Sequence, residues 1–204
     1  MLLHAAAYRR DKGAESHHDD SLRELAARLT ENDLIALLQT YVDVIALRKG
    51  PDAVPASWLI FGFSVLLYAA NWAAQFAVSR NAADVIGPSM MAYLSGLLVF
   101  LAVAIFSGYS SRALQMMSTI IAVGSLLAIL SIAATVLAVL LGAGTGAGYV
   151  GLGVYLWSIP VKGHILARTI NTHWLIGAAI AFLEYFLRRT IESGLYFMQQ
   201  GGVA

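Results

Sequence analysis

The last two long apolar stretches of this sequence contain a set of ionisable side chains: Lys162, His164, Arg168, Glu184, Arg188, Arg189 and Glu192. A charge inside a bilayer is costly and usually faces protein or water, so this set is the strongest candidate for chemistry in the chain. Glu184 and Arg188, and likewise Arg188 and Glu192, are four residues apart, which predicts that each pair shares one helix face and is neutralised there. We expect His164 to donate a hydrogen bond to Glu184 across the helix pair.

Three roles are open to this polar cluster. A proton or ion pathway would use a carboxylate and an imidazole, but such pathways normally run past helix breaks near the middle of the membrane. Pro160 is the only candidate break inside an apolar stretch. Contact with a partner subunit is the second role. Pairing of the last two helices, with Lys162 and Arg168 reaching toward an interface, is the role that the sequence favours.

The segment from Gly146 to Gly151 has the G-x-G-x-x-G spacing of dinucleotide-binding turns. That motif needs a strand before it and a helix after it, whereas here it joins two apolar helices. We therefore predict an uncharged loop over 142–148 and no nucleotide site.

Other catalytic and metal-binding patterns find little support. The sequence contains no cysteine, which excludes disulfides, thiolate metal sites and cysteine nucleophiles. His17, His18, Asp19 and Asp20 include metal-binding groups, but a metal site needs ligands held by a fold, and these lie in a polar, unpatterned stretch. No arrangement of serine, histidine and carboxylate stands out as a catalytic triad. We predict no enzymatic activity and no cofactor.

Composition identifies a membrane as the solvent of this chain. Hydrophobic residues make up 59% of it and charged residues 12%, whereas a soluble domain has about 25% charged residues. The net charge of +1 leaves no basic stripe of the kind that binds nucleic acid. We predict an all-α membrane protein in contact with lipids and with other integral membrane subunits or a second copy of itself.

The apolar stretches predict how often the chain crosses the bilayer. A hydrocarbon core about 30 Å thick needs roughly 20 mostly apolar residues per helix. We predict a polytopic bundle of about five transmembrane helices, over about 57–78, 88–106, 114–141, 149–168 and 173–197. Pro88 is placed at the start of the second span, where a missing amide costs least. Ala69, Ala73 and Ala77 form a stripe of small residues that predicts close packing against another helix.

The first fifty residues differ from the rest. Residues 1–20 are polar and predict a flexible tail. Residues 21–50 predict amphipathic helices, opened by a capping box at Ser21–Glu24 and ended by the segment Arg48–Pro51. We expect these helices to lie on the cytoplasmic membrane surface or against a partner protein. Their predicted apolar face holds Leu34, Leu38, Tyr41 and Ile45.

The distribution of positive charge predicts the orientation. Cytoplasmic flanks of membrane helices carry an excess of Lys and Arg. With five spans and a cytoplasmic N-terminus, ten of the thirteen Lys and Arg residues fall on the cytoplasmic side, and only Arg80, Arg188 and Arg189 fall outside. The predicted C-terminus is therefore on the outer side.

Two segments, Leu47–Ser57 and Trp157–Leu166, resemble small uncharacterised bacterial inner-membrane proteins that look like the Yip1 superfamily. The resemblance covers about residues 47–197, and it implies a non-enzymatic, multi-pass protein of the bacterial inner membrane that acts through protein partners. Arg188 and Arg189 depart from the unbroken apolar last span that the resemblance implies.

Two functions follow as expectations. The first is an accessory or scaffolding subunit of an inner-membrane assembly, since small-residue helix faces and an amphipathic cytoplasmic segment are typical of proteins that pair with other subunits. The alternative is a small transporter or channel subunit that uses His164 and Glu184 inside the membrane.

Overall fold

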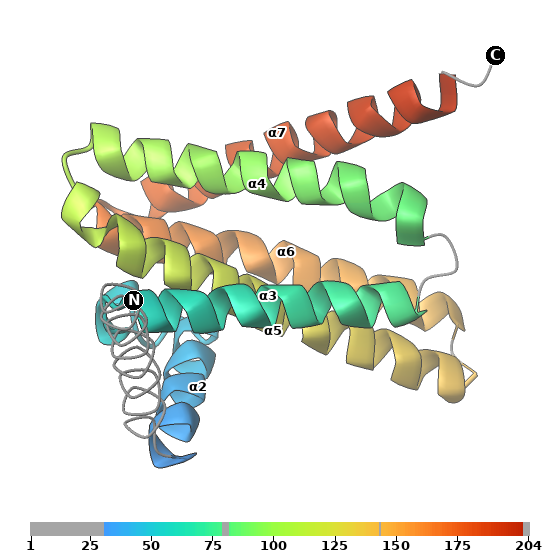
Figure 1. Ribbon diagram of the computed structural model, residues 1–204, viewed down its shortest axis with the longest axis horizontal. Helices are drawn as coiled ribbons and strands as arrows, with labels where there is room; N and C mark the ends of the chain where they lie inside the picture. The colour runs from blue at the N-terminus through green and yellow to red at the C-terminus, as the bar shows by residue number, and fades with distance from the viewer. Residues whose placement is uncertain (1–30, 79–81, 143, 202–204) are drawn as a thin grey trace, which may run out of the picture. The chain divides into compact units, whose positions relative to one another are not determined.

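The computed structural model describes residues 31–78, 82–142 and 144–201. These ranges hold six α-helices and two short 3-10 turns, and no strand occurs in them (Figure 1). The helices are α2 (Glu31–Ile45), α3 (Trp58–Val78), α4 (Ala82–Phe106), α5 (Ala113–Leu140), α6 (Gly144–Thr169) and α7 (Trp174–Gly201). The predicted all-α fold is confirmed. The predicted tail over 1–20, its cluster at His17–Asp20, the capping box at Ser21–Glu24 and Arg80 lie outside the described residues.

The chain divides into two compact units within α2, residues 1–39 and residues 40–204. The described part of the first unit is the beginning of α2, which is regular helix. The second unit holds the last turns of α2 and all five long helices.

Helices α3 to α7 run alternately in opposite directions and are joined by short connections (Figure 1). Helix α5 packs against α3 and α6, and α6 packs in turn against α7. Helix α4 packs chiefly against α7 and only loosely against α3, the helix that precedes it in the chain. The five helices therefore surround a common interior, and the seam between α3 and α4 is loosely closed.

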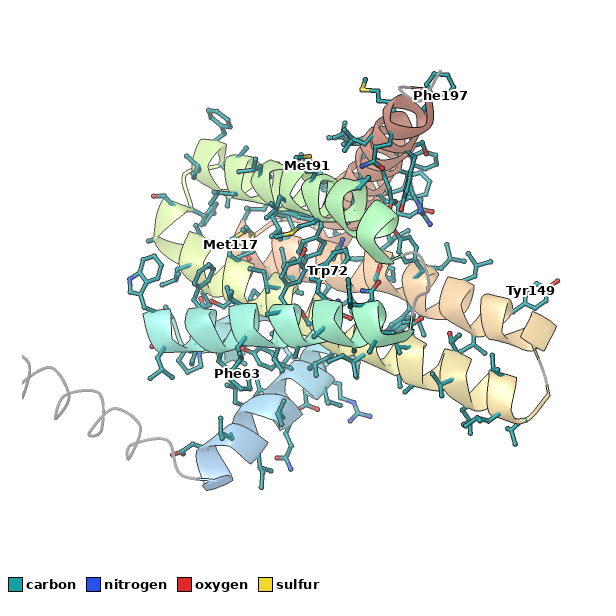
Figure 2. The ribbon with its side chains drawn as sticks, turned by 45° about the vertical axis from the view of Figure 1, so that its right-hand side comes forward. Phe63, Trp72, Met91, Met117, Tyr149 and Phe197 are labelled. Carbon is teal, nitrogen blue, oxygen red and sulfur yellow. The ribbon has the colours of Figure 1, made fainter. Side chains whose placement is uncertain are left out.

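Four segments are long and apolar enough to cross a membrane: Trp58–Ala77, Gly87–Phe106, Ser110–Leu140 and Gly148–Thr169. Large apolar side chains cover the outside of the bundle, and Figure 2 shows Met91, Tyr149 and Phe197 pointing away from it. An apolar outer surface of this extent suits a bilayer. Helix α7 has 28 residues but is interrupted by charges and is not among the four, so the fifth span stays a prediction.

The predicted loop over 142–148 is wrong from Gly144 onward. Helix α5 ends at Leu140, Gly142 turns the chain with a φ of 74°, and α6 already begins at Gly144. The segment Gly146–Gly151 is therefore the first turns of a helix. A glycine costs a helix about 1 kcal/mol relative to alanine, but a backbone without water must satisfy its own polar groups, and helix formation does so.

Two prolines, Pro88 and Pro160, lie inside helices, and neither interrupts its helix. Pro88 lies at the start of the apolar segment Gly87–Phe106, as predicted, but inside α4, which already begins at Ala82. Pro160 lies inside α6, which continues to Thr169. The candidate break at Pro160 is thus absent from the secondary structure.

Helix α2 ends at Ile45, earlier than the predicted stop at Arg48–Pro51. Leu47 adopts a φ of 60°, and the amides of Arg48 and Lys49 both donate to the carbonyl oxygen of Asp43, at 2.8 and 3.3 Å. The Lys49 ammonium lies 2.9 Å from the Asp43 carboxylate, and this hydrogen bond holds the pKa of Asp43 below its usual value. Arg48 and Lys49 therefore cap the C-terminal end of α2 through their contacts with Asp43, which lies in the last turn of the helix. On the opposite face Tyr41 is fully buried.

Close helix packing occurs at a different place from the predicted alanine stripe. Ala69, Ala73 and Ala77 are exposed. The tight crossing joins α6 to α7: a Cβ on Gly163 would lie 2.5 Å from the Ala178 Cα, and a Cβ on Gly177 would lie 2.1 Å from the Gly163 carbonyl oxygen. Only glycines permit this backbone contact.

We expect Gly177→Ala to lower the melting temperature of the detergent-solubilised protein, since the added methyl group meets backbone atoms that cannot rotate away. Overpacking of this kind costs about 1–3 kcal/mol. Gly153→Ala, also in a long helix but with no atom within 4 Å of its Cβ, is the matched control and should be neutral or stabilising. Equal melting temperatures for the two variants would contradict the tight crossing.

Candidate functional site

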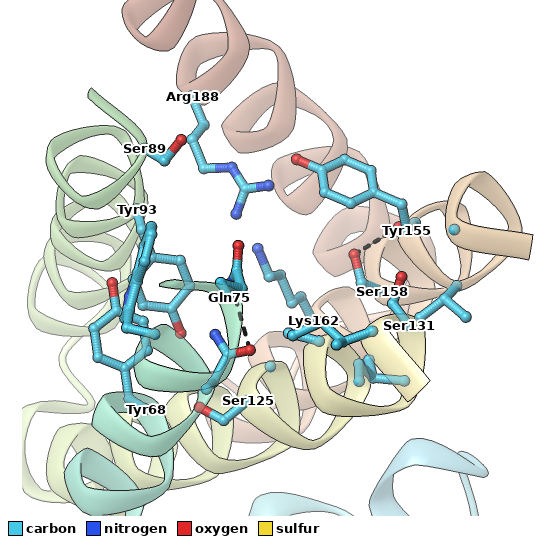
Figure 3. Close-up of a pocket in the computed structure, with 18 of the residues that line it drawn as sticks. Tyr68, Gln75, Ser89, Tyr93, Ser125, Ser131, Tyr155, Ser158, Lys162 and Arg188 are labelled. Atoms are coloured by element: carbon cyan, nitrogen blue, oxygen red, sulfur yellow. Dashed lines mark hydrogen bonds between the residues drawn. The ribbon is translucent and has the colours of Figure 1, made fainter. Parts of the chain in front are cut away.

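A cavity of about 300 Å³ lies between the five long helices (Figure 3). Each helix contributes polar side chains to its wall. They are Tyr68, Asn71, Trp72 and Gln75 from α3, Ser89 and Tyr93 from α4, Ser125 and Ser131 from α5, Tyr155, Ser158 and Lys162 from α6, and Arg188, Arg189 and Glu192 from α7.

The polar residues face the cavity because they follow the helical repeat. Tyr68, Asn71 and Gln75 are spaced by three and four residues on α3, and so are Tyr155, Ser158 and Lys162 on α6. On α7 the charged face is turned inward, while the apolar Leu183 is 67% exposed. A polar side chain in a membrane helix is least costly when it faces protein or water.

The most deeply buried ion pair joins α6 to α7. The Lys162 Nζ lies 3.2 Å from the Glu184 Oε2, and these side chains are 12% and 2% exposed. Helix α4 covers the pair at Gly96, where an added Cβ would lie 2.1 Å from the Glu184 Oε1. Phe100 of α4 also presents its ring to the Lys162 ammonium, 5.8 Å from the ring centroid. Three helices therefore meet at one ion pair.

A second ion pair lies within α7. The Arg189 Nη1 is 2.9 Å from the Glu192 Oε2, and the Ser89 hydroxyl of α4 donates to the Glu192 Oε1 at 2.5 Å. This pair is more exposed than the first, since the Arg189 side chain is 52% exposed. It links α7 to α4 further along the helix.

Arg188 has no carboxylate partner among the side chains that the structure describes. Neither predicted pair forms: no ion pair within 4 Å joins Arg188 to Glu184 or to Glu192. Its guanidinium instead lies over the ring of Tyr155, 5.2 Å from the centroid. The spacing of four residues does place these side chains on one face, but each carboxylate meets another cation: Lys162 of α6 for Glu184 and Arg189 for Glu192.

Four hydrogen-bonding groups at the cavity also lack partners. Within the part of the chain that the structure describes, the hydroxyls of Tyr68, Tyr93 and Tyr155 and the indole nitrogen of Trp72 are buried without a hydrogen bond. The Tyr68 and Tyr93 rings stack with centroids 4.7 Å apart. A buried donor left unsatisfied costs about 1–3 kcal/mol, so these groups favour a polar occupant of the cavity.

Two residues of the predicted cluster lie elsewhere. The His164 Nε2 is 3.2 Å from the Lys49 carbonyl oxygen, and the Arg168 side chain packs beside Gly50. The predicted bond from His164 to Glu184 is therefore wrong. Two residues along an α-helix correspond to a rotation of about 200°, so the turn that points Lys162 into the bundle points His164 away from it.

The cavity wall holds residues that we did not single out from the sequence. Tyr68, Asn71 and Gln75 give α3 a polar stripe at helical spacing inside an apolar stretch, and this pattern is visible in the sequence. Trp72 adds an indole donor to the same side, and Figure 2 shows it between α3 and α4. The polar face of α3 is the signal that could have identified an interior site from the sequence.

Removing one partner of a buried ion pair costs about 3–5 kcal/mol, whereas an apolar replacement of the whole pair is often neutral. We therefore expect Lys162→Met and Glu184→Leu each to lower the melting temperature of the solubilised protein and the double variant to recover most of the loss. The same cycle at Arg189 and Glu192 is the control and should show weaker coupling, because that pair is more exposed. Additive losses at Lys162 and Glu184 would contradict the pairing.

Comparison with known proteins adds no assignment, since no family model, no curated protein and no solved structure matches the chain. The Yip1-like resemblance stays a prediction. The function has to be argued from the cavity itself.

Proposed function

We propose that this protein is a small transporter that holds a polar solute in the cavity between its five long helices. The cavity of about 300 Å³ carries this proposal, because it lies inside a bundle of membrane helices and is lined by charges and unsatisfied donors. Polar groups in a membrane interior are costly and commonly mark a solute pathway. Helix pairing uses Lys162 and Glu184 and leaves Arg188 and the four donors unexplained.

The proposed pathway differs in its residues from the one expected from the sequence. Glu184 is paired with Lys162 through its Oε2. His164 bonds to the chain near residue 49, away from the cavity. In this proposal Arg188, rather than Glu184 or His164, is the charged group that contacts the solute. Figure 3 shows Arg188, Lys162 and Gln75 converging from α7, α6 and α3.

The packing of α4 supports a route into the cavity. Helix α4 is held to α7 by Gly96 against Glu184 and by Ser89 against Glu192. It packs only loosely against α3. In the proposed mechanism a solute enters between α3 and α4. Separating these two helices breaks the stacking of Tyr68 on Tyr93 but leaves the ion pairs of α7 intact.

Helix α7 serves as the fifth crossing in this proposal. Its charged residues face the cavity, and its outer face is apolar, with Phe182, Leu183 and Phe186 each at least half exposed. It also runs opposite to α6 (Figure 1). We place the protein in the bacterial inner membrane with a cytoplasmic N-terminus and the C-terminus on the outer side.

A role as an accessory subunit is the second candidate. Ala69, Ala73 and Ala77 form an exposed small-residue stripe on α3, and such a stripe permits close approach of a helix from another subunit or a second copy. This role accounts for the outer face of α3 but leaves the cavity without a purpose.

We expect a reporter fused after Ala204 to be active on the outer side of the inner membrane. With a cytoplasmic N-terminus, five crossings put the C-terminus on the opposite side of the membrane. The measurement compares a reporter active only outside with one active only in the cytoplasm. A fusion after Gly142 is the control, and it should give the same side as Ala204, since two further crossings separate them. Opposite sides for the two fusions would exclude α7 as a crossing.

The absence of cysteine permits a direct test of the cavity. We expect Ser158→Cys, on the cavity wall, to react with membrane-impermeant charged thiosulfonates in oriented membrane vesicles. Leu66→Cys is the control: its side chain is 65% exposed on the outside of α3, where lipid keeps the thiol protonated and charged reagents away. Failure of Ser158→Cys to react with either a cationic or an anionic reagent from either side would overturn the solute pathway.

A further inference from the structure

The charges of the described side chains at the cavity do not balance. Lys162, Arg188 and Arg189 supply three positive charges, and Glu184 and Glu192 supply two negative ones. Both carboxylates are already paired, so the surplus charge is located on Arg188. An uncompensated charge away from water is costly, and an arriving anion would offset that cost.

The groups around Arg188 suit the recognition of an anion. Tyr93 and Tyr155 present hydroxyls, and Trp72 presents an indole nitrogen, none of which has a hydrogen-bond partner in the described ranges. An indole N–H only donates, a tyrosine hydroxyl can donate, and a guanidinium offers two parallel N–H groups to a carboxylate. The Arg188 guanidinium is already oriented by the ring of Tyr155 beneath it.

The remaining wall combines amides and hydroxyls with aromatic and apolar surface, which suits an organic ligand rather than a hydrated inorganic ion. Four aromatic side chains, Tyr68, Trp72, Tyr93 and Tyr155, line the cavity beside Gly124, Leu127 and Ala128. Small-molecule sites typically combine such apolar and aromatic walls with a few polar groups that fix the orientation of the ligand.

We propose that the cavity binds a small organic anion with a single negative charge, whose carboxylate contacts Arg188 while its apolar part lies among the aromatic side chains. The inference rests on the proposed solute pathway and specifies its substrate class. One negative charge matches the one surplus positive charge. A cation would bring the total surplus to two positive charges, and a dianion would leave one negative charge uncompensated.

The test compares two thiosulfonate reagents at Ser158→Cys, one ending in a sulfonate and one in a trimethylammonium group. Each rate is divided by the reagent's rate with a free thiol in solution. We expect the anionic reagent to be favoured by about tenfold or more, since a unit charge a few ångströms away is worth over 1 kcal/mol in a protein interior. Arg188→Gln should abolish the preference, Arg188→Lys should retain part of it, and Arg168→Gln, a charge removed outside the cavity, should leave it unchanged.

The outcomes distinguish a failure of the proposed anion site from a failure of the proposed solute pathway. Reaction with both reagents but no preference for the anion would overturn the anion site and leave the solute pathway standing. No reaction with either would overturn the pathway. A preference that survives Arg188→Gln would exclude Arg188 as the residue that contacts the anion.

A binding measurement completes the test. Benzoate should slow the modification of Ser158→Cys by either reagent, whereas benzamide, its uncharged analogue, should not. The protection should be lost in Arg188→Gln, whose fold is checked by its melting temperature. Because Arg188 pairs with no carboxylate, that temperature should stay equal to or above that of the parent. Equal protection by benzoate and benzamide would overturn the role of the negative charge.

Discussion

The ion pair between Lys162 and Glu184 is the constraint on which the arrangement of the bundle depends. In a medium of low dielectric constant an unpaired charge is far more costly than in water, so two side chains exposed by only 12% and 2% have to meet. Meeting requires α6 and α7 to touch, which Gly163 and Gly177 permit, and it requires space on α4, which Gly96 leaves. The burial of this one ion pair therefore accounts for a glycine at the contact on each of three helices, α4, α6 and α7.

The same pair determines which way α7 faces. With Glu184 directed at α6, helical geometry directs Arg188 and Glu192 to the same side, one and two turns further along. Their inward direction leaves the apolar side chains of α7 outside, and it gives the interior more polar groups than the helices can satisfy among themselves. The cavity is thus a consequence of the orientation of α7, and its surplus charge is a consequence of having two arginines beside one available glutamate.

The sequence predicted the bounds of the helices better than the contacts between them. Helix α3 begins one residue after its predicted start and α5 one residue before, because apolar length is a local property. Gly144, Gly146 and Gly148 were assigned to a loop because a run of glycines is typical of one, but in a membrane, where water cannot satisfy the backbone, they form helix. The pairing of Glu184 with Arg188 failed for another reason: spacing within α7 is known from the sequence, but the rotation of α6, which brings Lys162 closer and removes His164, is set by tertiary packing.

Stability and the proposed function depend on different members of one cluster. A structural role accounts for Lys162 and Glu184, since removal of either leaves a buried charge, and for Glu192, which joins α7 to α4 through Ser89. It does not account for Arg188, because an unpaired cation with nearby unsatisfied hydroxyls lowers stability relative to an apolar side chain of similar size. Functional sites are where such costs are found in folded proteins. Arg188 is therefore the one charge in the cluster that the fold does not need and that a ligand would neutralise.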